Sequence, residues 1–226
     1  MPHRLSRTIR HRRLIALIVS AGLLMVLPGC AMMDAPTGSI SRQEAIGSDD
    51  WHDVATEADR QRIRGWWTAW RDALASARAG GHGAAVAAEG ALLMPDAALP
   101  NPHLPPGDYL CRTIKVGARA AQGLAYVAYP RFRCRVEAEQ DIFSFTKLTG
   151  SQRQVGLIFD DDERHKIFLG TLMLGDEVRA LDYGSDPQRD VAGLIERIGP
   201  NRWRLVMPRP AFESIVDVIE LVPADQ

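Results

Sequence analysis

The sequence predicts an α+β protein that is mainly β: an antiparallel barrel or sandwich of about eight strands, preceded by one or two helices. Three observations support this prediction. From residue 107 onward, apolar residues recur with the period of two that is typical of strands. Short stretches rich in Gly, Asp and Asn separate these runs as turns. No helical pattern interrupts the series, which favours antiparallel pairing over parallel strands joined by crossover helices.

Residues 1–29 have the parts of a bacterial lipoprotein signal peptide. The segment 1–13 carries five arginines and no acidic residue, and an uncharged apolar run follows from Leu14 to Leu27. That run has the length of a signal-peptide core and is short for a membrane span. The sequence Leu27-Pro28-Gly29-Cys30 resembles the lipobox, although Pro28 replaces the usual small residue. We therefore predict lipidation of Cys30 after cleavage before it.

Lipidation would hold the mature protein on the periplasmic side of the bacterial envelope. Ala31 follows the cysteine in place of Asp, which resembles the sorting signal for the outer membrane. The alternative is an ordinary signal peptide or an uncleaved anchor, with Cys30 incidental. Residues 30–50 are small and lack apolar periodicity, so we expect a flexible tether. The mature chain keeps 22 basic residues against 28 acidic ones, a formal charge of −6, which argues against nucleic acid as a partner.

Residues 51–94 are predicted to form an N-terminal helical segment. Two aspartates before Trp51 can cap a first helix, and the glycine pair at 80–81 ends it. A second, weaker helix, rich in alanine, runs from Ala84 to Met94. The apolar residues of the first helix recur at steps of three and four: Ile63, Trp66, Trp67, Trp70 and Leu74.

Residues 95–226 are predicted to form the β domain. Five prolines between residues 95 and 106 mark an irregular connection to the helices. The clearest strand is 131–137, in which charge and apolarity alternate so that Phe132, Cys134 and Val136 face inward. The strand-like runs, with 191–198 as a less regular ninth, are 108–116, 124–128, 131–138, 142–148, 152–159, 166–174, 202–207 and 214–222.

Two groups of side chains are candidate contacts to a ligand or a partner. One is the tryptophan group of the first helix: Trp66, Trp67 and Trp70. The favoured alternative is that this face packs on the body of the domain. The other is a row of cations on one face of a strand, which could contact phosphate or carboxylate groups: Arg131, Arg133 and Arg135. The favoured alternative here is a solvated outer face.

Cys111 and Cys134 lie in neighbouring strand-like runs among residues that can face inward. In the oxidising periplasm we expect them to form a disulfide, which would stabilise the fold by roughly 3 kcal/mol. A reactive thiol or a metal pair is the alternative. No Cys-x-x-Cys motif and no histidine at ligand spacing supports it.

Signals for catalysis are weak. The sequence has no Gly-x-Ser-x-Gly elbow, no His-Glu-x-x-His motif and no phosphate-binding glycine loop. His165 is a candidate general base, but the sequence identifies no partner for it. The acidic turn 160–163 and the loop with Asp182, Asp186 and Asp190 could bind calcium, yet solvated turns explain them more simply. We therefore predict no catalytic residue, no metal and no cofactor.

Five segments carry a family resemblance: 106–115, 132–134, 149–153, 196–199 and 202–206. They resemble an uncharacterised domain-of-unknown-function family of exported proteobacterial proteins, over the chain from about Trp51 to the C-terminus. The resemblance implies an exported setting and no particular reaction. At the level of fold, the series of strands also resembles lipocalin-type and protease-inhibitor barrels, which transfers no function.

Three hypotheses for the function remain. The leading one is a non-enzymatic envelope lipoprotein whose barrel binds an apolar or amphipathic ligand, because the run 167–174 is apolar on both faces. A barrel of about eight strands either holds one small ligand or fills itself with side chains. The second is a protein-binding or inhibitor-like module that recognises an envelope protein through the tryptophans or the arginines. The third is a hydrolase without a recognisable motif.

Overall fold

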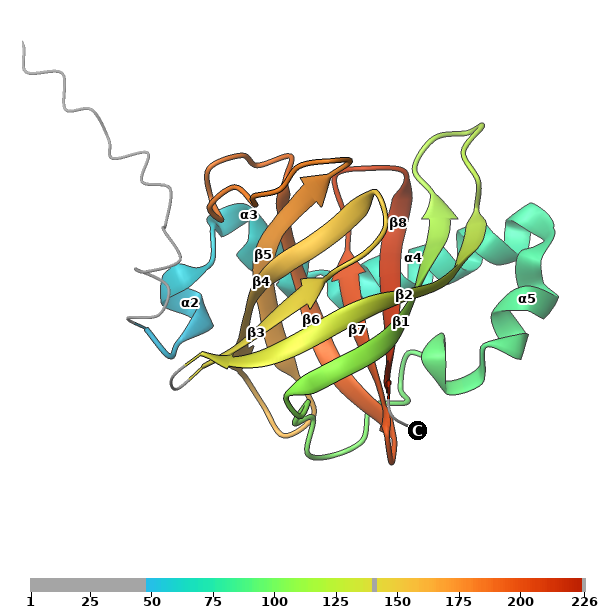
Figure 1. Ribbon diagram of the computed structural model, residues 1–226. Coiled ribbons are helices and arrows are strands. Elements are labelled where there is room, and N and C mark those ends of the chain that lie inside the picture. The colour runs from blue at the N-terminus through green and yellow to red at the C-terminus, as the bar shows by residue number, and fades with distance from the viewer. Residues whose placement is uncertain (1–47, 140–141, 225–226) are drawn as a thin grey trace, which may run out of the picture. The chain divides into compact units, whose positions relative to one another are not determined.

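The computed structural model describes residues 48–139 and 142–224 of the chain, so the predictions on the signal peptide and on Cys30 lie outside the described residues. The β domain is a closed barrel of eight sequential antiparallel strands, in which the first pairs with the last (Figure 1). The prediction of a mainly β, antiparallel protein is confirmed, and the barrel is selected over the sandwich. The strands are β1 (Gly107–Ala118), β2 (Tyr126–Glu139), β3 (Ile142–Lys147), β4 (Gln152–Asp160), β5 (Lys166–Leu174), β6 (Asp190–Gly199), β7 (Arg202–Pro208) and β8 (Ser214–Pro223).

One strand was predicted as two. The runs 124–128 and 131–138 belong to the single strand β2, in which Tyr129 and Pro130 lie opposite the one residue Thr113 of β1. Pro130 lacks an N–H for the ladder and is accommodated in this bulge, so it does not end the strand. The less regular run 191–198 is β6, and the number of strands therefore stays at eight.

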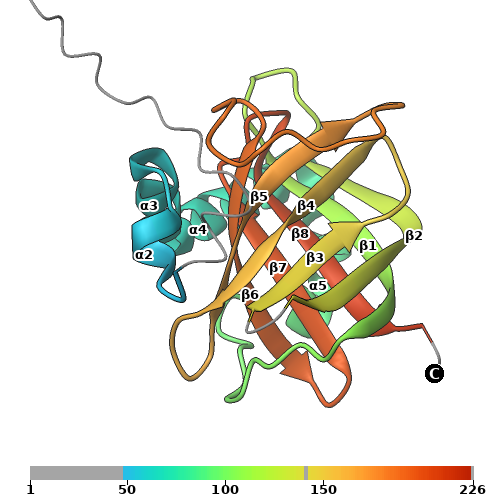
Figure 2. The ribbon, with the colours of Figure 1, turned by 60° about the vertical axis from the view of Figure 1, so that its left-hand side comes forward.

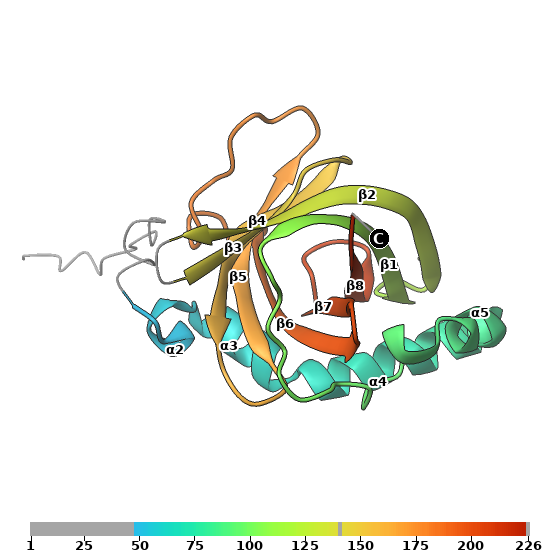
Figure 3. The same ribbon diagram turned by 60° about the horizontal axis from the view of Figure 1, so that its bottom comes forward.

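The helices lie outside the barrel and run along one side of it (Figures 2 and 3). They are α2 (Trp51–Val54), α3 (Glu57–Arg64), α4 (Trp66–Ala77) and α5 (Gly83–Ala88), with a π-helical turn at Arg78–His82 and a 3-10 turn at Gly90–Leu92. Among the described residues, no helix combines the length and the apolarity that crossing a membrane requires.

The single first helix that the sequence predicts is wrong, because the segment breaks into three helices. The Asp50 side chain caps α2, as predicted, by accepting a hydrogen bond from the backbone N–H of His52 at 2.9 Å. The Thr56 hydroxyl then caps a new helix, α3, by accepting from the N–H of Asp59 at 3.2 Å. At the other end Gly81 has φ of +85°, a conformation that favours glycine and bends the chain between α4 and α5.

Helices and barrel share two outer hydrophobic cores. α4 packs against β1, β7 and β8, with Trp70 and Leu74 buried at the contact. α2 and α3 cover the outer face of β4, β5 and β6, where Trp51 and Val54 are buried. The run 167–174 is apolar on both faces because one face lies under these helices and the other lines the barrel interior.

The barrel interior is filled by its own side chains. Its core includes Phe145 and Phe168, whose rings meet edge to face at 5.7 Å, together with Trp203. Cys134 and Val136 face this core and Phe132 packs against it, as the alternation along β2 predicts. The choice left open by the sequence, between an internal ligand and internal packing, is therefore decided in favour of packing over this part of the barrel.

The predicted disulfide is confirmed. Cys111 of β1 and Cys134 of β2 are bonded, with their Cα atoms 5.9 Å apart, and both are fully buried in the barrel interior. The bond joins two strands that already pair, and the loop it closes includes the long β1–β2 hairpin. It limits the freedom of the unfolded chain over that hairpin.

Candidate functional site

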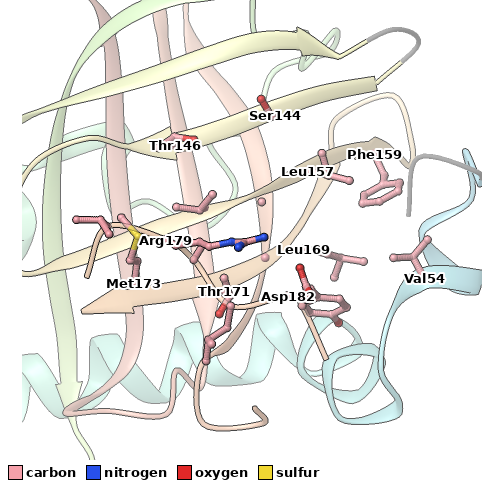
Figure 4. Close-up of a pocket in the computed structure, with 17 residues that line it drawn as sticks. Val54, Ser144, Thr146, Leu157, Phe159, Leu169, Thr171, Met173, Arg179 and Asp182 are labelled. Carbon is pink, nitrogen blue, oxygen red and sulfur yellow. The ribbon is translucent and has the colours of Figure 1, made fainter. Parts of the chain in front are cut away.

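A groove on the outer face of β3, β4 and β5 is the candidate site. The loop 175–189, which joins β5 to β6, covers it, and its volume is about 500 Å³. Figure 4 shows its lining side chains converging from the strands, from α2 and from the loop. We call it the outer groove. Its lining residues are Val54, Ser144, Thr146, Val155, Gly156, Leu157, Phe159, Leu169, Gly170, Thr171, Met173, Val178, Arg179, Ala180, Leu181, Asp182 and Tyr183.

Two glycines bring β4 and β5 close together beneath the outer groove. Gly156 of β4 pairs directly with Gly170 of β5. A Cβ atom on Gly156 would lie 2.2 Å from the backbone oxygen of Leu169 and 2.5 Å from the Cα of Gly170. No other residue type permits so close an approach of the two backbones. Because Leu157 and Leu169 face outward, side chains at Gly156 and Gly170 would point into the barrel interior, where Phe168 lies.

The rest of the floor is apolar and rigidly held. Leu157, Phe159 and Leu169 are buried, and each packs in the core that α2 and α3 share with the barrel. Val54 of α2 closes one end of the groove beside them. Because the helices beside the groove hold these side chains in place, the groove does not depend on the ligand to shape its floor.

A buried polar group of the groove has no hydrogen-bond partner within the described residues. The Thr171 side chain is 3 % exposed, and its Oγ1 atom contacts no donor or acceptor in the described part of the chain. Leaving a buried hydroxyl unsatisfied costs about 1–3 kcal/mol. An atom that lines a groove at this cost is placed to meet a polar group of a bound molecule.

The loop 175–189 is anchored at its base by Glu177 and Arg189. Their side chains form an ion pair at 2.9 Å, and Glu177 also accepts from the N–H of Leu174 at 2.8 Å. These hydrogen bonds, with that of Arg189 first, lower the pKa of Glu177 to about 2. Arg153 of β4 adds hydrogen bonds to the carbonyls of Gly175 and Glu177.

The far end of the loop is anchored to α3. The Tyr183 hydroxyl donates to the buried Asp59 carboxylate at 2.6 Å and accepts from the N–H of Thr56 at 3.1 Å. Arg62 holds the same carboxylate in an ion pair at 2.6 Å. Burial, followed by the negative charge of Asp59, raises the pKa of Tyr183. Burial likewise raises the pKa of the neighbouring Asp190 carboxyl to about 6.

Between these anchors, residues 178–181 form no hydrogen bond within the described part of the chain. We call residues 178–182 the lid. The Val178 side chain is 98 % exposed and that of Leu181 46 % exposed, although both line the outer groove. Loop segments with few stabilising contacts open at low free-energy cost. The lid therefore has the properties of a movable cover over a preformed floor.

The tryptophan group predicted as candidate contacts does not line the outer groove. Trp70 is buried, donates to the carbonyl of Leu93 at 3.3 Å and lies under the guanidinium of Arg204 at 4.4 Å. Trp66 packs partly buried against the helix cores, and Trp67 is 42 % exposed. This helical face mainly packs on the barrel, which is the alternative that the sequence favoured.

The arginine group lies on the outer face of β2 and does not line the outer groove, although Arg135 pairs in register with the groove-lining Thr146 of β3. Arg135 pairs with Asp108 of β1 at 2.7 Å. The side chains of Arg131 and Arg133 are exposed, and neither forms an ion pair or a hydrogen bond within the described residues, although the charge of Arg133 helps to lower the pKa of Asp108. In the β1–β2 register, Arg131 lies opposite Arg112.

His165 has the partners that the sequence did not identify, but they occupy both ring nitrogens. Its Nδ1 lies 2.9 Å from Asp162 and its Nε2 lies 3.1 Å from Glu196. Burial alone would lower the pKa of His165, but the hydrogen bonds and charges of Glu196 and Asp162 raise it to about 9. With both nitrogens protonated, His165 has no lone pair with which to act as a base.

The same geometry weakens the acidic turn as a metal site. Asp161, Asp162 and His165 each bring one ligand atom within 4.8 Å of the others. However, the imidazole nitrogens are hydrogen-bonded to carboxylates, and Asp161 accepts from the indole N–H of Trp51 at 3.0 Å. These contacts fasten the β4–β5 turn to α2 and to β6.

One end of the barrel interior is polar. Lys115 Nζ lies 3.1 Å from Asp217 and 3.0 Å from Glu213. Lys147 donates to the carbonyl of Gln152 at 2.7 Å and has no carboxylate partner in the described part of the chain. Burial, followed by the charge of Lys115, lowers the pKa of Lys147 to about 8. The void beside these residues measures about 20 Å³, room for about one water molecule.

Two features of the sequence are partial signals for the outer groove. One is the apolarity of 167–174 on both faces. The other is the presence of Val178 and Leu181 in a loop that is otherwise polar. Neither indicates that β3, β4 and the loop meet, because that requires the barrel register.

Residues 51–221 match the model of a family described as domain of unknown function DUF4893. The match confirms the predicted resemblance to an uncharacterised family, while the exported setting stays a prediction. No curated protein and no solved structure matches the chain.

Proposed function

The chain belongs to the DUF4893 family of domains of unknown function, which assigns no activity. From the geometry of the outer groove, we propose that the protein is a non-enzymatic envelope lipoprotein that binds a small amphipathic molecule. The ligand occupies the outer groove, and not the barrel interior. The observation that carries this proposal is the unpartnered Thr171 hydroxyl in a groove of about 500 Å³ whose floor is apolar. Ligand sites of this size combine an apolar wall with a few placed polar groups.

The envelope setting comes from the sequence. A lipid on Cys30 and a tether over residues 30–50 would keep the domain close to a membrane, where amphiphiles are concentrated. Intact mass of the membrane-extracted protein should show cleavage before Cys30 and added acyl mass. A soluble form that begins elsewhere would contradict this part of the proposal.

Ligand binding is tested by native mass spectrometry on protein with Cys30→Ser, which removes the acylation site. We expect adducts that solvent extraction identifies as amphiphiles.

In a fluorescence titration with anilinonaphthalene sulfonate, Ala180→Trp should weaken binding of the dye about tenfold or more, because the indole fills the groove from the lid. The matched control is Ala121→Trp in the exposed β1–β2 turn, which should leave binding unchanged. A clean apo mass with no difference between the two variants would refute the groove.

A protein-binding module is the second candidate function. It is favoured by the exposed, unpaired Arg131 and Arg133 on β2, which together offer an anionic partner two guanidinium groups on one strand face. Cross-linking in the envelope should then recover one specific protein, and Arg131→Glu with Arg133→Glu should abolish its capture. Recovery of non-specific neighbours alone would count against it.

A further inference from the structure

The lid contributes two opposite charges to the outer groove. Arg179 and Asp182 both line it, and Figure 4 shows both side chains among the lining residues. Neither side chain has an ion-pair or hydrogen-bond partner in the described part of the chain. Elsewhere in the same loop, Glu177 and Arg189 are paired with each other. Two charges that border the groove are thus left without an ion pair, whereas the pair at the base of the loop is satisfied within the protein.

These charges restrict the chemistry of the ligand. A guanidinium group binds phosphate or carboxylate well, since its paired N–H donors match two oxygens. A carboxylate such as that of Asp182 attracts an ammonium group and repels an anion. A purely anionic head group would be attracted by Arg179 and repelled by Asp182. A neutral head group would leave both charges without an ionic partner.

We propose that the outer groove binds a single-chain zwitterionic amphiphile. The inference rests on the proposed function and names its ligand class. The anionic group of the ligand, a phosphate or a carboxylate, pairs with Arg179, and its ammonium group pairs with Asp182. Its hydrocarbon chain lies on the floor formed by Leu157 and Leu169.

Thr171 completes the recognition between these two parts. Its buried hydroxyl lies on β5 between the apolar floor and the lid and has no partner of its own. The linker of a single-chain lipid carries ester and hydroxyl oxygens at the corresponding position, between chain and head. A hydrogen bond there would satisfy Thr171 and fix the depth at which the chain enters.

The test compares three single-chain lipids with the same acyl chain. Their head groups are phosphoethanolamine, which is zwitterionic, phosphoglycerol, which is anionic, and glycerol, which is neutral. Calorimetric titration of the protein with Cys30→Ser, below the micelle concentration of each lipid, gives three dissociation constants. Phosphoethanolamine should bind about fivefold more tightly than either of the others, the magnitude of one exposed ion pair.

Two variants test which charged group of the ligand each lid side chain contacts. Arg179→Gln should weaken binding of the phosphoethanolamine and phosphoglycerol lipids about fivefold and leave the glycerol lipid unchanged. Asp182→Asn should weaken the phosphoethanolamine lipid and strengthen the phosphoglycerol lipid. The matched control is Arg71→Gln, which removes an exposed cation from α4 on another side of the barrel and should change no constant.

The outcomes separate this inference from the proposed function. Equal affinity for the three lipids, or tightest binding of the phosphoglycerol lipid, would overturn the proposed preference for a zwitterionic head group. The outer groove would then remain a site for amphiphiles in general. Absence of binding by all three, together with a clean apo mass, would overturn both.

Discussion

Two sides of the barrel are apolar on the outside, and the chain covers them in different ways. On the side of β1, β7 and β8, the helix α4 packs directly on the strands. There the fully buried Arg204 bonds to Glu196 and to backbone carbonyls of residues 91–95, so buried polar groups are satisfied. On the side of β3, β4 and β5, a loop lies over the outer groove, and Thr171 keeps an unpartnered hydroxyl.

This difference indicates separate roles for the two sides, stability for the packed side and binding for the groove side. A packed helix gains stability from each buried contact and leaves no room for another molecule. A loop held only at its ends leaves volume and polar groups for a ligand, and the packed side supplies the stability that this requires. Substitutions on the packed side should therefore change the free energy of unfolding, and those on the groove side should change binding.

The largest effect is expected at Arg204. Arg204→Ala should lower the free energy of unfolding by roughly 3–5 kcal/mol, because it leaves the buried Glu196 carboxylate with His165 alone and removes the donor of four backbone carbonyls. Urea denaturation measures the change. Arg131→Ala, on the exposed face of β2, is the control and should stay within about 0.5 kcal/mol. A loss at Arg204 no larger than the control would mean that the packed side does not carry the stability.

The second effect concerns His165, which links the β4–β5 turn to Glu196. Its pKa in the folded protein, about 9, lies above the value of 6.5 that histidine has in an unfolded chain. The folded state thus holds this proton more tightly, and the resulting stabilisation, about 3 kcal/mol, is fully present below pH 6.5. It is lost as the pH rises through 9.

The measurement is the difference in unfolding free energy between the protein and His165→Phe across pH 6 to 10. Taking the difference cancels Lys147, whose lowered pKa works in the opposite direction over the same range. The difference should shrink toward pH 10. A difference that does not vary with pH would show that the imidazole is not held as a cation.

Much of the fold could be predicted from local pattern, whereas the groove could not. Alternation along β2 placed Cys134 and Val136 inward, and the disulfide followed from that placement and the expected compartment. The helix breaks were missed because Thr56 caps a new helix within a stretch whose apolar spacing looks continuous. The outer groove depends on the pairing of β3, β4 and β5 and on Tyr183 reaching Asp59, and the last of these contacts joins segments far apart in sequence. No periodicity within one segment encodes them.

The smallest effect has the opposite sign and tests the comparison most directly. Thr171→Val replaces the unpartnered hydroxyl with a methyl group of similar shape, so it removes the cost of burying that hydroxyl. The free energy of unfolding should rise by up to about 1 kcal/mol. Affinity for the phosphoethanolamine lipid should fall about fivefold, the loss of one hydrogen bond.

Thr113→Val is the matched control, because the Thr113 hydroxyl is also buried without a partner but faces the barrel interior. It should raise stability similarly and leave affinity unchanged. If both variants left affinity unchanged, Thr171 would be no more than a packing defect, and the groove would lose the polar contact that distinguishes it from the packed side.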